Sequence, residues 1–152
     1  MRTAIRGNIS ESAVLHALVR RGFHVLLPFG DGCPYDLVVG LDDGVLIRVQ
    51  VKTGRVRQPG SVTFNAYSTD HGRGPGSYLG LADVFGVYFP PRDSVYLVPV
   101  LETGRTEVSL RFAPPRNNQR RRVRQARDYL IENWTTDALR AVARGEPDAI
   151  AA

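Results

Sequence analysis

Four polar side chains of the sequence combine residue types that can do chemistry on a charged substrate. Asp36 opens an apolar run, and Gln50 and Lys52 stand two positions apart near the end of the next apolar run. Because side chains of a β-strand alternate between its faces, Gln50 and Lys52 project from the same face. An acid, an amide and a lysine at one end of a strand pair are poorly explained by packing. We therefore interpret these residues as a candidate active site, which an earlier acid joins: Glu11, Asp36, Gln50 and Lys52.

The oxygen atoms of this group suit a hard divalent cation, provided that the segments converge. Carboxylate, amide and backbone carbonyl oxygens are the ligands that Mg²⁺ and Mn²⁺ prefer. We therefore expect a Mg²⁺ site, in which Mn²⁺ can substitute, with these ligands: Glu11, Asp36, Gln50 and the backbone carbonyl of Val51. A metal there would polarise a phosphodiester and lower the pKa of a bound water. Lys52 would orient or activate that water and offset charge on the phosphate.

Lys52 is the only lysine among the 20 lysine and arginine residues of the chain. Lysine carries a compact ammonium whose pKa shifts readily, and arginine does not replace it where chemistry needs that property. The histidines at 16, 24 and 71 lack the spacing of metal ligands, and a lone cysteine, Cys33, excludes a cysteine-based zinc site. No other part of the sequence competes with the group around Lys52.

Composition sets the class of protein. A chain of 152 residues with 43% hydrophobic residues is long enough for one domain with a real core. It contains no apolar run long enough to span a membrane and begins without a signal-peptide pattern, so we expect a cytoplasmic, nucleoid-associated protein with no membrane partner. The net charge of +5 and a pI near 9.9 favour polyanionic partners.

The elements that would position the site follow from periodicity. Residues 9–21 carry an apolar stripe typical of an amphipathic helix, and Asn8 with Glu11 resembles a capping box, which gives Glu11 an alternative structural role. Residues 35–40 and 45–52 form a predicted hairpin around an Asp-Asp-Gly turn. Further strands are expected at residues 23–28, 62–67, 84–89, 95–100 and 106–112, with a glycine-rich loop at 68–77.

A basic segment follows this predicted sheet. Residues 111–127 contain seven arginines and no acid, and a narrow apolar stripe predicts a basic helix over residues 116–131. Such a helix is either a solvated face or a contact surface for nucleic acid, and we favour the second interpretation. We expect one domain over residues 1–133, followed by a C-terminal helical extension over residues 134–152.

The ordered motifs resemble the PD-(D/E)xK nuclease superfamily, most closely its group I intron-associated homing endonucleases and more distantly Holliday-junction resolvases. They are Gly7-x-x-x-Glu11, Pro34-Tyr35-Asp36-Leu37-Val38 and Arg48–Thr53, and the resemblance covers roughly residues 4–130. It implies an α/β (α+β) fold with a central mixed β-sheet flanked by helices, a restriction-endonuclease-like core. It also implies that Asp36 and the second-strand residue hold the metal, that Glu11 supports it, and that Lys52 lies at the water.

The sequence departs from the superfamily at Gln50, where Asp or Glu is usual. A neutral ligand weakens metal affinity, although the intron-associated group accepts glutamine there, so an active enzyme is the favoured interpretation. The resemblance implies a Mg²⁺-dependent DNA endonuclease of the homing or defence type. The alternatives are a structure-specific Holliday-junction resolvase-like nuclease and a catalytically inactive DNA-binding module.

DNA is the expected partner, and cutting both strands requires two active sites, so we expect a homodimer or homotetramer. Arginines after the second hairpin strand and in the basic segment would hold phosphates. Amides of the basic segment either read base edges, since amides pair with adenine, or form a turn. The candidate DNA-binding residues are Arg55, Arg57, Asn117, Asn118, Gln119, Arg120, Arg121, Arg122 and Arg124.

Overall fold

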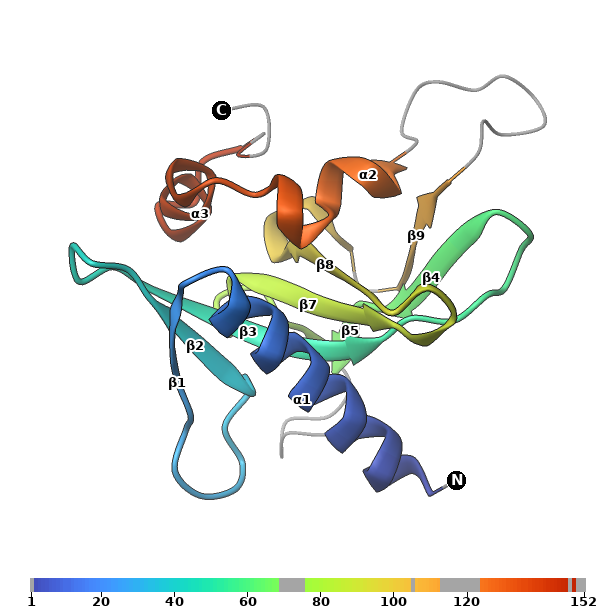
Figure 1. The fold of residues 1–152 in the computed structure, drawn as a ribbon, viewed down its shortest axis with the longest axis horizontal. Helices are drawn as coiled ribbons and strands as arrows, with labels where there is room; N and C mark the ends of the chain where they lie inside the picture. Colours follow the sequence, from blue (N-terminus) through green and yellow to red (C-terminus); the bar gives the residue numbers. More distant parts are fainter. Residues whose placement is uncertain (1, 69–75, 105, 113–123, 148, 150–152) are drawn as a thin grey trace.

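A five-stranded mixed sheet organises the chain in the computed structural model, which describes residues 2–68, 76–104, 106–112, 124–147 and 149 (Figure 1). Its strand order is β1-β2-β3-β7-β8, and every neighbouring pair is antiparallel except the parallel pair β3 and β7. The expected central mixed β-sheet flanked by helices is therefore confirmed. The strands are β1 (His24–Leu26), β2 (Leu37–Gly40), β3 (Leu46–Thr53), β7 (Val84–Phe89) and β8 (Ser94–Pro99).

The predicted hairpin forms around residues 42–44, as the Asp-Asp-Gly turn indicates. Gly44 adopts a φ of 87°, which a glycine enters without steric cost, and its N–H donates to the Leu41 carbonyl at 2.9 Å. In the interior of β3, Ile47, Val49 and Val51 are buried, and the polar residues between them, with Lys52, face the other way and are half-buried. This alternation places Gln50 and Lys52 on one face of the sheet, as the period of two predicts.

The helix that carries Glu11 begins earlier than the sequence predicts. It is α1 (Thr3–Arg20), and its N-cap residue, Arg2, makes no side-chain capping bond. Asn8 therefore lies inside the helix, and the predicted capping box is wrong. The physical reason is Gly7: an interior glycine costs a helix only about 1 kcal/mol, so it did not stop helical pairing from extending toward the N-terminus.

Two fully buried side chains, Val14 and Leu18, fix α1 on the sheet. Each such burial contributes on the order of 1.5–3 kcal/mol. The helix also approaches β7 closely at Gly86, where an added Cβ would lie 2.8 Å from Val14 Cγ1 and 3.0 Å from Val49 Cγ1. The absence of a side chain at Gly86 thus sets the distance between helix and sheet, and with it the position of Glu11.

We expect Gly86→Ala to destabilise the protein by roughly 1–3 kcal/mol, because both crowded neighbours are stiff, β-branched valines. Thermal melting measures this as a fall in Tm of several degrees. Gly7→Ala is the matched control, since a Cβ at Gly7 meets nothing within 4 Å and a helix favours alanine. Equal Tm values for the two variants would contradict this account of the close approach.

The face of the central sheet opposite α1 carries a smaller sheet. Its strand order is β10-β9-β4, and it consists of β4 (Ser61–Asn65), β9 (Glu107–Arg111) and β10 (Arg124–Gln125). The short strands β5 (Tyr67–Ser68) and β6 (Gly76–Ser77) pair with each other. Val62 and Phe64 are among the buried residues that pack against Phe85 of the central sheet. The 3-10 turns η1 (Pro90–Arg92) and η2 (Val100–Glu102) follow β7 and β8.

The basic helix expected over residues 116–131 is wrong for its described part. Arg124 and Gln125 form β10, which pairs in parallel with β9, and only Ala126–Tyr129 are helical, as α2. Backbone pairing along the edge of β9 and burial of Ala126 and Tyr129 outweigh the helix preference of so short a segment. Residues 116–123 lie outside the described residues, as do residues 69–75 of the expected glycine-rich loop.

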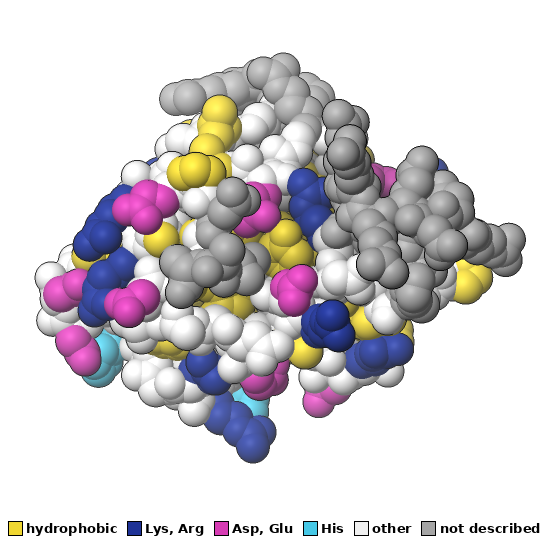
Figure 2. All heavy atoms as spheres, turned by 90° about the horizontal axis from the view of Figure 1, so that it is seen from above, with side chains coloured by type: hydrophobic (Ala, Val, Ile, Leu, Met, Phe, Trp, Pro, Cys, Tyr) yellow, Lys and Arg dark blue, Asp and Glu magenta, His cyan; other side chains and the backbone are white. Residues whose placement is uncertain are grey.

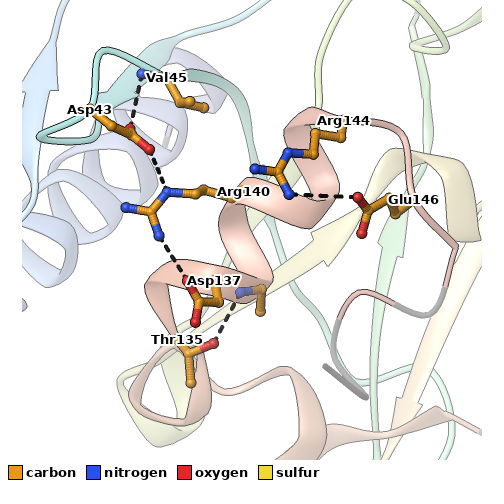
Figure 3. Close-up of polar contacts among 8 residues, drawn as sticks. Asp43, Val45, Thr135, Asp137, Arg140, Arg144 and Glu146 are labelled. Atoms are coloured by element: carbon orange, nitrogen blue, oxygen red, sulfur yellow. Dashed lines mark hydrogen bonds and ion pairs between the residues drawn. The ribbon is translucent and has the colours of Figure 1, made fainter.

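The C-terminal residues pack on the main core. After η3 (Ile131–Asn133), the Trp134 indole N–H donates to the Leu97 carbonyl at 3.1 Å. Helix α3 (Thr136–Ala143) begins at the capping hydroxyl of Thr135 and buries Leu139 in the same cluster as Val14. Figure 3 shows that Arg140 of α3 pairs with Asp137 of the same helix and with Asp43 of the hairpin turn. No described helix has the length and apolarity to cross a membrane.

Candidate active site

Asp36 lies directly before β2 and is held against the backbone of β3. Its own N–H donates to the Val49 carbonyl, and its Oδ2 accepts from the Val51 N–H, both at 2.9 Å. These two bonds extend the hairpin ladder by one step and fix the carboxylate beside the Gln50–Val51 peptide. The side chain is thus positioned by the strand pair itself, as the hairpin pattern predicts.

The amide of Gln50 lies next to the carbonyl of Val51, since its Nε2 is 3.4 Å from that oxygen. Both groups were expected to bind the metal, and the structure brings them together at the end of β3. The Asp36 carboxylate reaches the N–H of the same residue, Val51. Three of the four predicted metal ligands therefore lie around one residue, Val51.

Glu11 reaches this end of the sheet from α1. Partial burial raises the pKa of the Glu11 carboxyl, and the negative charge of Asp36 raises it further. Two carboxylates that repel each other in a partly buried place are the arrangement that a bound cation stabilises. The helix and the strand thus bring Glu11 and Asp36 within electrostatic reach of each other.

The Lys52 side chain is half-buried and projects from the face of β3 opposite the face that packs against α1. Its Nζ donates to the Tyr67 carbonyl at 3.2 Å and to the Tyr78 hydroxyl at 3.4 Å, and lies 4.7 Å from the centre of the Tyr78 ring. Burial lowers the pKa of the Lys52 ammonium, and the nearby charge of Asp36 acts in the opposite direction. The structure therefore holds this amine in a defined position within electrostatic reach of Asp36.

No sequence pattern points to Tyr78, although it contacts the lysine. It is 3% exposed, and its ring meets Phe85 edge-on at a centroid distance of 5.5 Å. Tyr78 follows β6 and lies 26 residues beyond Lys52, so only the folded chain brings them together. The one signal in the sequence is a large aromatic residue next to a glycine-rich segment, which is too common to indicate a site.

A second contact outside the predicted set braces the helix against the strand. The Ser10 and Thr53 hydroxyls lie 2.5 Å apart, and Ser10 is buried. These residues are the chain neighbours of Glu11 and Lys52. The bond therefore links the helix to the strand one residue away from each of two candidate catalytic side chains.

The donor set has the chemistry of a weak Mg²⁺ site. Among the described residues, no three His, Cys, Asp or Glu side chains come close enough to hold a metal ion. The expected ligands include only two ionised groups, Glu11 and Asp36, and the remaining ligands are neutral oxygens. Such a set fits a hard cation that keeps several waters, with modest affinity.

The candidate DNA-binding residues are only partly described. Arg55 and Arg57 both pair with the carboxylate of Glu107, and Arg124 donates to the Glu102 carbonyl. Asn117, Asn118, Gln119, Arg120, Arg121 and Arg122 lie outside the described residues. On the face shown in Figure 2, the basic side chains that the structure describes lie among acidic ones.

Comparison with known proteins agrees with this geometry. Residues 1–132 match the family described as PD-(D/E)XK endonuclease. Among solved structures, the bacterial homing endonuclease I-Ssp6803I is similar, with 25% sequence identity and a TM-score of 0.64 over 86% of this chain and 89% of that chain. No curated protein matches the sequence significantly. Because the family match spans most of the sequence and the hairpin with its lysine is present, the chain belongs to the PD-(D/E)XK endonuclease family.

Proposed function

We propose that the protein is a Mg²⁺-dependent, sequence-specific DNA endonuclease of the homing or defence type. One observation carries the proposal: Lys52 is half-buried and held by Tyr67 and Tyr78 within electrostatic reach of Asp36. A lysine that served solubility alone would extend into water. The similarity to a homing endonuclease along most of both chains supports the narrower assignment.

In this proposal the carboxylates, the Gln50 amide and the Val51 carbonyl hold one divalent cation, and Mn²⁺ can replace Mg²⁺. A cation held there would supply Lewis-acid chemistry, which would polarise the phosphodiester and lower the pKa of a water. Lys52 orients the attacking water and offsets the charge that develops on the phosphate oxygens. The water oxygen bonds to phosphorus as the bond to the 3′ oxygen breaks; the attacking water gives up one proton and the leaving 3′ oxygen takes up one, which leaves a 5′-phosphate and a 3′-hydroxyl.

The arginines following β3 and those of the basic segment would contact the DNA backbone, and the amides 117–119 would read bases or form a turn. Cutting both strands requires two sites, so we propose that the chain acts as a homodimer or homotetramer. An enzyme of this kind works where DNA is, which places it in the cytoplasm, at the nucleoid.

Gln50 leads to a prediction about metal affinity. We expect Gln50→Glu to lower the Mg²⁺ concentration for half-maximal cleavage by about tenfold, because a third charged ligand replaces a neutral one and each 1.4 kcal/mol is a factor of ten. Calorimetric titration with Mn²⁺ in the absence of DNA must show the same direction. Gln58→Glu is the matched control, since Gln58 contacts Arg111 away from the site. Unchanged Mn²⁺ affinity in Gln50→Glu would remove Gln50 from the ligand set.

The proposed function itself is tested by substrate choice. Purified protein is incubated with linear duplex, four-way junction and single-stranded DNA, each with Mg²⁺ and with EDTA. Cleavage of duplex fragments at defined sites supports the homing or defence assignment, and a preference for junctions supports the resolvase alternative. Inactivity on every substrate, with salt-sensitive binding retained, would identify an inactive DNA-binding module.

A further inference from the structure

The small sheet is amphipathic, and its polar face lies away from the core. Val62 and Phe64 of β4 are buried in the core, and the alternate residues Thr63 and Asn65 lie on the other face, where Thr63 is also buried and Asn65 is half-buried. On that face Thr63 pairs with Ser109 and Asn65 with Glu107. The chain leaving β3 adds Arg55 to the same surface through two backbone hydrogen bonds with Thr63, of 2.9 and 2.8 Å.

Glu107 gathers two arginines on this face. One carboxylate oxygen accepts from Arg55, and the other accepts from Arg57. Arg55 also donates to the Asn65 side-chain oxygen at 3.1 Å. The arginine side chains are 44% and 63% exposed and the glutamate 31%, so the cluster carries one net positive charge at the surface.

The Glu107 carboxylate places one oxygen on each of the two guanidinium groups. A DNA phosphodiester could bind the same two groups through its two non-bridging oxygens. Arginine matches both anions because its donors form a planar fork. Ion pairs exposed to solvent contribute little net stability, since water competes for both partners. Exchange of the Glu107 carboxylate for a DNA phosphate would therefore leave the fold intact.

We propose that Arg55 and Arg57 form a contact site for one phosphate of the DNA backbone, and that Glu107 occupies this site until DNA displaces it. The inference rests on the proposed function in taking DNA as the ligand. It adds that an acid of the chain itself competes with the substrate and limits DNA affinity. The alternative is a purely structural ion pair that braces β4 against β9.

The test is the affinity of the full chain for a random-sequence 30-base-pair duplex, followed by fluorescence anisotropy in EDTA so that no cleavage occurs. We expect Glu107→Gln to bind about three- to tenfold more tightly than the unmodified protein at low salt, because the competing charge is gone. Glutamine keeps the shape of the side chain, and Glu107→Ala must shift the affinity in the same direction. Glu146→Gln, which removes an equivalent charge paired with Arg144, is the matched control and leaves affinity within about twofold.

The gain in DNA affinity expected for Glu107→Gln must depend on Arg55 and Arg57. In an Arg55→Gln/Arg57→Gln background, binding weakens, the slope of log affinity against log salt falls by about one, and Glu107→Gln adds nothing further. A Glu107→Gln variant that binds no more tightly than Glu146→Gln would overturn the proposal. So would a gain that persists without the arginines.

Cleavage assays separate this inference from the proposed function. If no DNA is cleaved with Mg²⁺ but Glu107→Gln still tightens binding through the arginines, the proposed enzyme activity fails and the phosphate site stands. If DNA is cleaved but Glu107→Gln has no effect on affinity, the phosphate site fails and the nuclease assignment stands.

Discussion

Lys52→Ala abolishes DNA cleavage, with an expected loss of at least about 10³-fold in rate, and leaves DNA affinity within a few-fold. The magnitude follows from the proposed roles of the amine, since a positioned proton-transfer or charge-stabilising group contributes about 10²–10⁴-fold. Binding survives because Lys52 is half-buried and the proposed phosphate contacts lie on other residues. Single-turnover cleavage and anisotropy in EDTA measure the two quantities separately.

Stability gives this prediction a second readout. Burial lowers the pKa of Lys52 below its ordinary value of 10.5, so the unfolded chain binds the proton more tightly than the folded chain. The charged lysine therefore opposes folding below the folded-state pKa, and this cost disappears as the pH rises through the window up to 10.5. Lys52→Met removes the charge and keeps an apolar stem, so we expect its Tm at neutral pH to rise while cleavage is lost.

Lys52→Arg separates charge from geometry. A guanidinium keeps the charge but is larger and planar, and the amine lies between the Tyr67 carbonyl and the Tyr78 ring. We expect cleavage by this variant to be nearly as low as that of Lys52→Ala. Normal cutting by Lys52→Arg would show that the chemistry needs only a positive charge, and the interpretation of the single lysine would be wrong.

Local pattern was enough to predict the hairpin and the side-chain directions in β3. The turn residues and the alternation from Ile47 to Lys52 act over a few positions, where strand geometry is strict. The mixed direction of the strands in the central sheet agrees with the family resemblance. The end of α1 was also predictable, since Gly22 terminates it with a φ of 87°.

Contacts between distant segments were beyond the reach of sequence patterns. Tyr78 meets Lys52 across 26 residues, and Ser10 meets Thr53 across 43. Residue types do not specify such pairs, because many serines, threonines and tyrosines in the chain are chemically equivalent. The strand at Arg124–Gln125 was missed for the same reason: its partner is the edge of β9, not a neighbour in sequence.

The sequence left two interpretations of Glu11 open, and the position at which α1 begins excludes one of them. From the sequence it was either a capping acid or a member of the site. Because α1 begins at Thr3, Glu11 lies beyond the first turn, where a capping role is impossible. Its pKa responds instead to burial and to Asp36, which supports the proposed role at the candidate active site, and that role stays a prediction.

The second large effect is expected at Asp36. We predict that Asp36→Ala and Asp36→Asn each reduce cleavage by at least about 10³-fold, because the proposed metal site would lose one of its two charged ligands and, with it, the cation expected to activate the attacking water. DNA affinity in EDTA changes little. Asp42→Asn is the matched control, an exposed acid in the turn of the same hairpin, and it should cut normally.

The two Asp36 variants differ in stability, which separates charge from structure. Asparagine retains a side-chain oxygen for the Val51 N–H, whereas alanine leaves this partly buried donor without that partner. We expect Asp36→Ala to lose about 1–2 kcal/mol of unfolding free energy and Asp36→Asn less. Equal loss of cleavage with unequal loss of stability would assign the cleavage defect to the missing charge.

The pKa of Glu11 provides a measure of the Asp36 charge that does not depend on a cleavage assay. Asp36 raises the pKa of the Glu11 carboxyl, but burial is the larger cause. In Asp36→Asn the pKa of Glu11 must therefore fall, yet stay above its ordinary value of 4.5. An NMR titration of the Glu11 carboxyl carbon measures this shift without metal or DNA. A Glu11 pKa that does not respond to Asp36→Asn would mean that the two carboxylates do not share one site, and the proposed metal site would lose its fourth ligand.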